Sequence, residues 1–259
     1  MINPTAKISA IYRYPVKGLS PERLGRTTLS VGQTIPCDRL YAVENGPSSF
    51  DPANPAYLPK QRFLMLMRNA RLAGLRTAFD PATHTLSIRS ESREAALGDL
   101  RTLAGRQAIE RFLAEFCADE LCGPPKVLHA PGHSFSDVSR KVVSIINLAS
   151  VAAVENAAGA PLDPLRFRGN LHVEGWLAWQ EFDLVGREIA IGPSARLKIV
   201  KRIVRCAATE VDPDTGIRDV EVPRVLMKTF GHADCGVYAE TIEAGEIAEG
   251  DALTIRPPM

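Results

Sequence analysis

The chain has little of what marks several protein classes. Its 259 residues include five cysteines without a repeated spacing, and 31 basic against 30 acidic side chains leave a net charge of +1. An odd, unpatterned set of cysteines favours a reducing compartment over a disulfide scaffold, so we expect a cytoplasmic protein. The near-neutral charge argues against a general nucleic-acid binder. No apolar run reaches about 18 residues and no signal peptide opens the chain, so we expect no membrane association.

The common signatures of metal and nucleotide chemistry are also missing. The sequence has no Cys-x-x-Cys pair and no His-Glu-x-x-His, and a proline and a glycine between His129 and His133 prevent them from sharing a helical face. It also lacks the glycine-rich phosphate loops and the Gly-x-Ser-x-Gly nucleophile turn. These absences argue against a zinc site, a nucleotide-binding loop and a serine hydrolase of that type.

What is present predicts a globular, mainly β protein. Apolar residues make up 45% and charged residues 24% of the chain, which is enough for one large or two modest cores. Residues 46–59 read as a proline-rich loop, 65–75 are ambiguous between helix and strand, and the Pro/Gly-rich stretch 124–136 is the predicted domain boundary. Short strands separated by turn residues favour a barrel over an alternating βαβ sheet. Helices are predicted at 106–121 and 148–157, and strands at 8–16, 27–31, 39–44, 75–79, 85–88, 142–146, 171–174, 188–191, 197–207, 237–241 and 252–255.

One cysteine stands out from the other four. Cys206 ends a stretch that begins at Ala195 and contains no acidic residue, and a turn-forming sequence follows it at 211–216. Nearby cations favour the thiolate, the form of cysteine that attacks or binds metals. The alternative is a solvated basic strand with one half-buried thiol, and the spacing leaves both readings open. The basic residues of this stretch are Arg196, Lys198, Lys201, Arg202 and Arg205, whereas Cys117 and Cys122 are expected to pack and Cys37 and Cys235 to be structural more often than functional.

Several short motifs, taken in order, resemble one family. They are Tyr14-Pro-Val-Lys17, Asp38-Arg39, Arg166-Phe-Arg-Gly-Asn170, the run from Cys206 to Gly216, and Gly250-Asp251. The chain is similar to MOSC (molybdenum cofactor sulfurase C-terminal) proteins of the two-part kind, such as the mitochondrial amidoxime-reducing components and their bacterial counterparts. The likeness covers about residues 6–45 and 140–256. It implies a mainly β, α+β fold, with an N-terminal β-barrel-like segment at 1–130, a MOSC β-barrel domain at 131–259, and a few short helices.

The resemblance also implies a site. Cys206 would ligate the metal of a pterin-dithiolene molybdenum cofactor, because a thiolate is a soft ligand suited to a redox metal. The residues carried over as cofactor contacts are Lys17, Arg39, Arg168, Asn170, Arg205, and either Asn147 or Ser150. Two departures remove a hydroxyl from the family pattern, since Gly18 and Val204 stand where the relatives carry serine. Pyridoxal phosphate is not expected to bind this chain.

Three functions follow as hypotheses. The first is a molybdenum-dependent oxidoreductase that abstracts oxygen from small N-hydroxylated substrates. It would depend on a separate electron-donor protein, because the sequence contains no ferredoxin-like domain or iron–sulfur motif. The second is a molybdenum cofactor carrier or sulfur-transfer protein that uses a Cys206 persulfide. The third is a non-enzymatic protein that binds an anionic metabolite along the basic strand.

Overall fold

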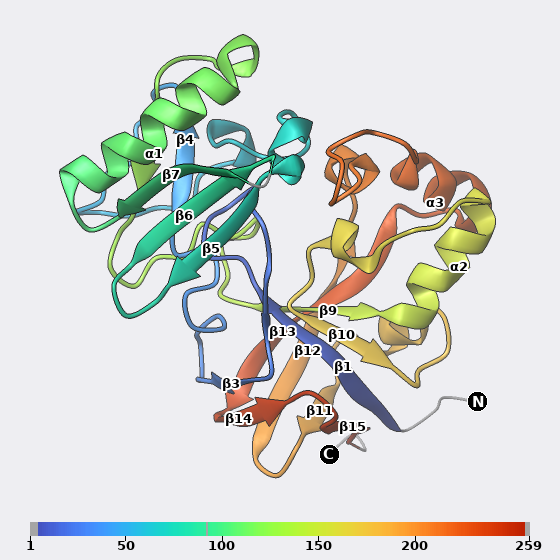
Figure 1. The fold of residues 1–259 in the computed structure, drawn as a ribbon. Coiled ribbons are helices and arrows are strands. Elements are labelled where there is room, and N and C mark those ends of the chain that lie inside the picture. Colours follow the sequence, from blue (N-terminus) through green and yellow to red (C-terminus); the bar gives the residue numbers. More distant parts are fainter. Residues whose placement is uncertain (1–4, 92, 257–259) are drawn as a thin grey trace.

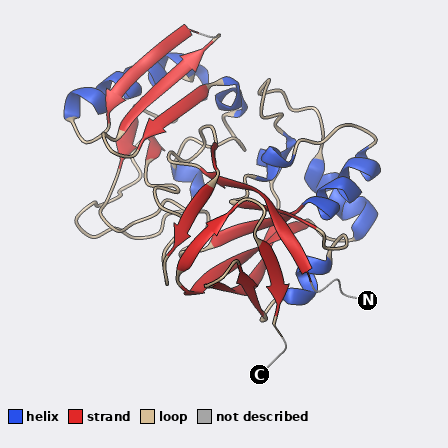
Figure 2. Ribbon diagram, turned by 60° about the horizontal axis from the view of Figure 1, so that its bottom comes forward, coloured by secondary structure: helices blue, strands red, loops and turns tan. Residues whose placement is uncertain are grey.

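The computed structural model describes residues 5–91 and 93–256. Their largest unit is a closed β-barrel, which fills the lower half of Figure 1 and is seen from another side in Figure 2. Neighbouring strands are antiparallel except β9 and β10, and pairing of β10 with β1 closes the barrel. In spatial order the barrel strands are β10 (Leu171–Glu174), β9 (Val143–Asn147), β13 (Asp234–Glu243), β12 (Ala195–Val204), β11 (Glu188–Ile191), β15 (Ala252–Ile255) and β1 (Thr5–Arg13).

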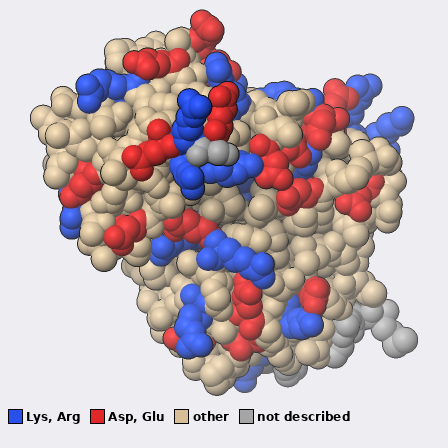
Figure 3. Space-filling view, in the orientation of Figure 1, with Lys and Arg blue, Asp and Glu red and all other residues tan. Residues whose placement is uncertain are grey.

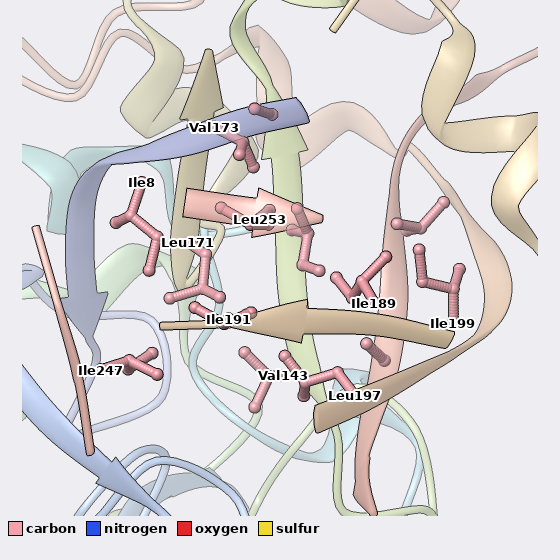
Figure 4. Close-up of a cluster of buried hydrophobic side chains, with 14 of the residues drawn as sticks. Ile8, Val143, Leu171, Val173, Ile189, Ile191, Leu197, Ile199, Ile247 and Leu253 are labelled. Atoms are coloured by element: carbon pink, nitrogen blue, oxygen red, sulfur yellow. The ribbon is translucent and has the colours of Figure 1, made fainter. Parts of the chain in front are cut away.

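Apolar side chains from all sides of the barrel fill its interior. Ile8, Leu171, Ile189 and Leu253 come from four different strands and are almost completely buried, and Figure 4 shows them among the other branched residues of this core. Strand β1 shows how the sequence produces this, because the alternate residues Ala6 and Ile8 are buried in this core, as a period of two requires. A register shift between Ile8 and Ala10 then makes Ile11 the next residue of β1 in the core.

A second lobe lies above the barrel in Figure 1. Helix α1 (Leu103–Phe116) packs there on an antiparallel sheet, and its Ile109 and Leu113 share a buried cluster with Phe79, Leu86 and Ile88 of that sheet. The oxygen of Thr102 begins the helix by accepting a 3.0 Å hydrogen bond from the Gly105 amide. The lobe sheet contains β5 (Arg76–Asp80), β6 (Thr85–Ser90) and β7 (Arg93–Asp99), and β4 (Ala42–Asn45) pairs with β8 (Pro125–Leu128) beside it.

Two further helices cover one end of the barrel. Helix α2 (Leu148–Ala158) ends at Gly159, whose φ of 67° is the left-handed conformation that glycine adopts without strain. Helix α3 (Val222–Phe230) packs against it and carries Pro223 in its first turn.

Among the described residues, no helix is both long enough and apolar enough to cross a bilayer. Three strands remain. Strand β2 (Glu22–Leu24) pairs with the end of β1, and β3 (Arg26–Leu29) pairs with β14 (Gly245–Ala248).

The structure confirms the predicted mainly β, α+β class with few helices. The predicted division into residues 1–130 and 131–259 stays a prediction. Strand pairing crosses that division, because β1 closes the barrel between β10 and β15, and β3 pairs with β14. The segment 65–75, ambiguous in sequence, forms turns and a short 3-10 helix at Ala70–Gly74.

The barrel contains one buried histidine with a strongly shifted pKa. His172 on β10 is 4% exposed, and its ring centroid lies 4.9 Å from that of Tyr12. Its Nε2 atom has no hydrogen-bond partner among the described residues. Burial lowers the pKa of His172 to about 4, because the imidazolium would lose its hydration there.

His172 should therefore make the fold sensitive to acid. The unfolded chain binds this proton near the ordinary histidine pKa of about 6.5, and the folded chain only near 4. Stability from this group is thus full above pH 6.5 and falls as the pH drops towards 4, by about 3 kcal/mol at most. Urea unfolding of wild type and His172→Gln between pH 7.5 and 4.5 measures the difference. Parallel curves for the two proteins would contradict this role.

Candidate functional site

A cavity of about 280 Å³ lies where the barrel meets the second lobe. Its walls come from the end of β12 and the turn after it, from the segment before β10, and from loops of the lobe. Basic side chains dominate the lining, although acidic and basic groups are interspersed over the face shown in Figure 3. The polar lining comprises Lys17, Asp38, Arg39, Lys60, Ser136, Asp137, Ser144, Arg166, Arg168, Asn170, Lys201, Arg202, Arg205, Cys206, Thr209 and Tyr238.

Cys206 is half-buried and lines this cavity. It lies two residues beyond the end of β12, and its carbonyl oxygen accepts hydrogen bonds from the Thr209 amide at 3.0 Å and hydroxyl at 2.9 Å. These bonds fix the turn that follows and hold the thiol at the cavity wall. The position agrees with the predicted cysteine at the end of a cationic strand.

Lys60 is the partner of this thiol that the sequence did not reveal. Its Nζ atom lies 3.1 Å from Cys206 Sγ, although 146 positions separate the two residues. Partial burial lowers the pKa of Lys60, but the hydrogen bond to Cys206 together with nearby negative charges, including Asp137, outweighs this and raises the pKa overall. Lys60 begins a short 3-10 turn after the proline-rich loop, where a lone lysine gives no signal of its role.

Arg39 and Arg168 meet at one aromatic ring. Their guanidinium carbons lie 4.4 and 4.3 Å from the centroid of the buried Tyr14 ring. Arg39 donates to both carboxylate oxygens of Asp38, at 2.7 and 2.6 Å, and to the carbonyl of Arg168 at 2.9 Å. Arg168 donates to the Leu19 carbonyl at 2.9 Å, and burial lowers its pKa to about 10. Arg39 is therefore neutralised locally and holds the Arg168 backbone in place.

Lys17 is also paired with a carboxylate. Its Nζ atom donates to the Phe135 carbonyl at 2.9 Å and forms an ion pair with Asp137. Burial lowers the pKa of Lys17. For Asp137, burial raises the pKa, but Lys17 together with the charges of Lys60 and Arg39 outweighs this and brings the pKa down to about 2. At neutral pH the two groups form a charged pair in the cavity wall.

Gly18, next to Lys17, explains one departure from the family pattern. Its φ is +83°, and an added Cβ would lie 2.8 Å from the carbonyl oxygen of Leu64. A serine at this position would be strained and would clash with that backbone. The second departure, Val204, is 73% exposed.

Asn170 and Arg205 line the cavity, but most of their hydrogen-bonding groups already bind other parts of the protein. The Asn170 side-chain oxygen accepts from the Ser144 amide and hydroxyl, and its nitrogen donates to the Tyr12 carbonyl. Arg205 donates to the carbonyls of Cys235 and Phe167. Both side chains thus tie the cavity wall to the barrel, and Ser144 joins them as a lining residue that sequence reasoning missed.

Arg166 explains why two of the sequence motifs occur together. Its guanidinium is 1% exposed and binds both oxygens of Asp219 at 2.7 Å and one oxygen of Asp212 at 3.0 Å. Asp212 in turn accepts from the amides of Asp214 and Thr215. The arginine of the first motif therefore holds the turn of the second. Its Nε atom is buried and has no hydrogen-bond partner among the described residues.

Asn147 and Ser150 are not among the residues that line the cavity, and the expectation that one of them contacts a cofactor stays a prediction. Asn147 caps α2 through the Ala149 amide, and both side chains donate to the buried carboxylate of Glu181, at 2.7 and 2.9 Å. Burial raises the pKa of Glu181. The strand-to-helix turn directs both residues away from the cavity and towards this carboxylate.

The other cysteines are separate from the site. Cys117 and Cys235 are buried, and burial raises the pKa of Cys235 to about 12. Cys37 is half-buried. Cys122 is exposed, against the expectation that it packs, because the helix before it ends at Phe116 and leaves it in a surface turn.

Comparison with known proteins adds the family. The family model of the MOSC domain matches residues 130–254. These residues form a MOSC domain. The domain family is associated with the molybdenum cofactor. The matched residues here contain five complete barrel strands and most of β15, together with Cys206, Arg168 and Asn170. Its barrel is completed by β1, which lies outside the matched residues.

Solved structures show only weak likeness. The YuaD protein from Bacillus subtilis has 13% identity and a TM-score of 0.47, over 98% of this chain and 97% of that one. YiiM from Geobacillus stearothermophilus has 18% identity and a TM-score of 0.35, over 44% of this chain and 54% of that one. Neither contributes to the assignment. No curated protein sequence matches the chain.

Proposed function

We propose that the protein binds a molybdenum cofactor in this cavity, with Cys206 as the ligand to the metal, and that it reduces small N-hydroxylated compounds. One observation carries the proposal. Cys206 belongs to the MOSC domain and is the one cysteine that lines the cavity among the described residues. It shares the cavity with eight basic side chains and two carboxylates. A cofactor that combines a soft metal with a phosphate requires a thiolate and cations together.

The residues present fit such a group. Arg168 lines the cavity and forms no ion pair among the described residues, so its charge is available to an anion. Lys17 and Arg39, by contrast, are neutralised by Asp137 and Asp38. Arg168 is thus the main anion contact in this proposal, and Arg39 positions it through its carbonyl oxygen.

The chain's own residues supply ligation and charge. Cys206 would hold the metal at the wall, and the Lys60 ammonium stabilises negative charge on its sulfur. Asn170 keeps the strand-side wall rigid through Ser144 and Tyr12. When bound, the cofactor supplies the two-electron chemistry that removes oxygen from a substrate. Electrons would come from a separate donor protein.

A sulfur-transfer function is the second candidate, and the Lys60 contact is the observation that favours it. An ammonium 3.1 Å from a half-exposed thiol would also stabilise the terminal anionic sulfur of a persulfide. In this case the Cys206 thiolate would attack the outer sulfur of a persulfide on a partner protein, whose own thiolate would leave. A second thiol would then release this sulfur as sulfide to a metal centre and form a disulfide with Cys206. Cyanolysis of purified protein would then release sulfane sulfur, whereas Cys206→Ala would release none.

Molybdenum content and turnover test the first function directly. Protein made in a host that synthesises the cofactor should retain about one molybdenum per chain. It should also reduce benzamidoxime with an artificial electron donor. Protein that holds molybdenum but reduces no oxidised-nitrogen compound would contradict the proposed reaction, and protein that acquires no molybdenum in such a host would contradict the proposed cofactor.

Arg168→Ala supplies the matched variant in the same experiment. Removal of an unpaired, charge-assisted contact of about 1.5–3 kcal/mol should lower molybdenum retention after dialysis about tenfold or more. Lys198→Ala, an exposed lysine on β12 that does not line the cavity, is the control and should retain wild-type molybdenum. Equal retention by Arg168→Ala and wild type would exclude Arg168 as the main anion contact.

A further inference from the structure

The basic residues of the cavity fall into two groups. In the interior, Lys17, Arg39 and Arg166 have carboxylate partners and Arg205 donates to carbonyl oxygens. Arg168 also belongs to this interior group, and it is the residue that the proposed function assigns to the cofactor. A second group, which we name the rim cations, comprises Lys60, Lys201 and Arg202. They line the same cavity as Cys206, are exposed or half-exposed, and have no ion pair among the described residues.

Strand β12 is irregular at Lys201 and Arg202, two of the rim cations. Register shifts interrupt the pairing of β12 with β13 on both sides of Lys201 and Arg202. A regular strand would send adjacent side chains to opposite faces, but here both residues are exposed and both line the cavity. Bulges of this kind redirect side chains next to functional sites. Tyr238 and Phe182 then support the two cations, at 5.6 and 4.3 Å from their ring centroids.

The placement of this charge has a direct electrostatic consequence. Unpaired cations at a concave, partly desolvated edge attract anions and raise their local concentration. Lys60 brings this charge to within 3.1 Å of the Cys206 sulfur. The exposed Val204, two residues before the cysteine, adds an apolar surface beside the charges. Because Lys201 and Arg202 line a cavity rather than a convex face, a small anion fits them better than a protein surface does.

We propose that the rim cations Lys60, Lys201 and Arg202 bind an anionic group of the substrate next to Cys206. The substrate class is then an oxidised-nitrogen compound that carries a carboxylate or another small anionic group. The reaction part of this inference rests on the proposed function. The electrostatic part concerns the chain alone and can be measured without the cofactor.

Two alkylating reagents of similar size measure the electrostatic part. Iodoacetate is anionic and iodoacetamide is neutral, and both react with the same thiolate, so the ratio of their rates cancels any change in thiolate fraction. Full-length protein without cofactor is treated with each reagent, and carboxymethylation or carbamidomethylation at Cys206 is followed by peptide mass spectrometry. The double variant Lys201→Gln/Arg202→Gln should lower the iodoacetate-to-iodoacetamide ratio at least about threefold at low salt.

The control and the salt dependence sharpen this experiment. Lys198→Gln removes a charge from the same strand outside the cavity and should leave the ratio unchanged. High salt should bring wild type and the double variant together, because it screens exposed charges. An identical low-salt ratio for wild type and the double variant would overturn the inference.

Turnover by molybdenum-loaded protein tests the substrate class. Wild type should show a higher kcat/KM for 4-carboxybenzamidoxime than for benzamidoxime, and the double variant should reduce that preference at least about threefold. If neither compound is reduced, the proposed function fails, while the alkylation ratio still decides the role of the rim cations. If both are reduced with equal kcat/KM, the proposed function stands and the anionic substrate class is wrong. Loss of molybdenum from the double variant would instead make these residues cofactor contacts and overturn the inference.

Discussion

Cys206→Ala is expected to abolish reduction of N-hydroxylated substrates while leaving the fold intact. Loss of groups that merely support metal ligands lowers affinity or activity by about 10–100-fold, so loss of the ligand itself should exceed that range. The thiol is half-buried and outside the apolar core clusters, so its removal takes little packing away. Steady-state turnover with an artificial electron donor, together with the unfolding midpoint, measures both effects.

Two companion variants make this result specific. Cys206→Ser should be equally inactive, because an alkoxide is a harder and less available ligand than a thiolate. Cys122→Ala removes an exposed thiol that does not line the cavity and should keep full activity. Full turnover by Cys206→Ala would exclude the ligand assignment.

Arg166→Ala is expected to produce the largest loss of stability among the cavity residues. It removes a buried guanidinium from between Asp212 and Asp219 and releases the turn that Asp212 organises. Breaking a buried ion pair by removing one partner costs about 3–5 kcal/mol. We expect the lower end of that range, because Asp219 is 43% exposed and water can compensate it. Urea unfolding at constant m-value gives the change in free energy of unfolding.

A surface ion pair provides the comparison for Arg166. Arg224 pairs with Glu221, and both side chains are mostly exposed. Arg224→Ala should change stability by less than about 1 kcal/mol, because exposed pairs contribute little. Arg166→Lys keeps the charge but loses the two-pronged contact with Asp219, and its stability should lie between those of wild type and Arg166→Ala. A loss in Arg166→Ala no larger than that in Arg224→Ala would refute its structural role.

Local sequence signals predicted much of the fold. Strands β10, β11 and β15 have the predicted bounds, and α2 begins and ends within one residue of its prediction. Each is short, apolar and bounded by turn residues or a glycine, so its pattern is complete within about ten residues. Strand β7 and helix α3 were not predicted. Most residues of β7 are partly or fully exposed, and α3 is short with a proline in its first turn.

The sequence predicted those site residues that belong to the short motifs. The order of the motifs placed Cys206, Arg168 and Lys17 together, and the structure finds them in one cavity. The motifs could not distinguish Arg39, which is neutralised by its neighbour Asp38, from Arg168, which forms no ion pair within residues 5–91 and 93–256. They also could not show that Asn147 and Ser150 donate to Glu181, because a helix cap and a ligand contact use the same polar residue types.

The amino-acid sequence alone determined the β-rich class, the MOSC-like motifs and the thiol at the end of a basic strand, because these depend on neighbouring residues. The tertiary structure decided what depends on residues far apart in the chain. It brought β1 into the barrel, and it placed Lys60 3.1 Å from the Cys206 sulfur. It also paired Arg166 with Asp212 and Asp219, and left Lys201 and Arg202 at the rim without an ion pair to any residue that the structure describes. Such contacts follow from the packing of distant segments, and no local pattern encodes which cation will meet a carboxylate and which will remain available to a ligand.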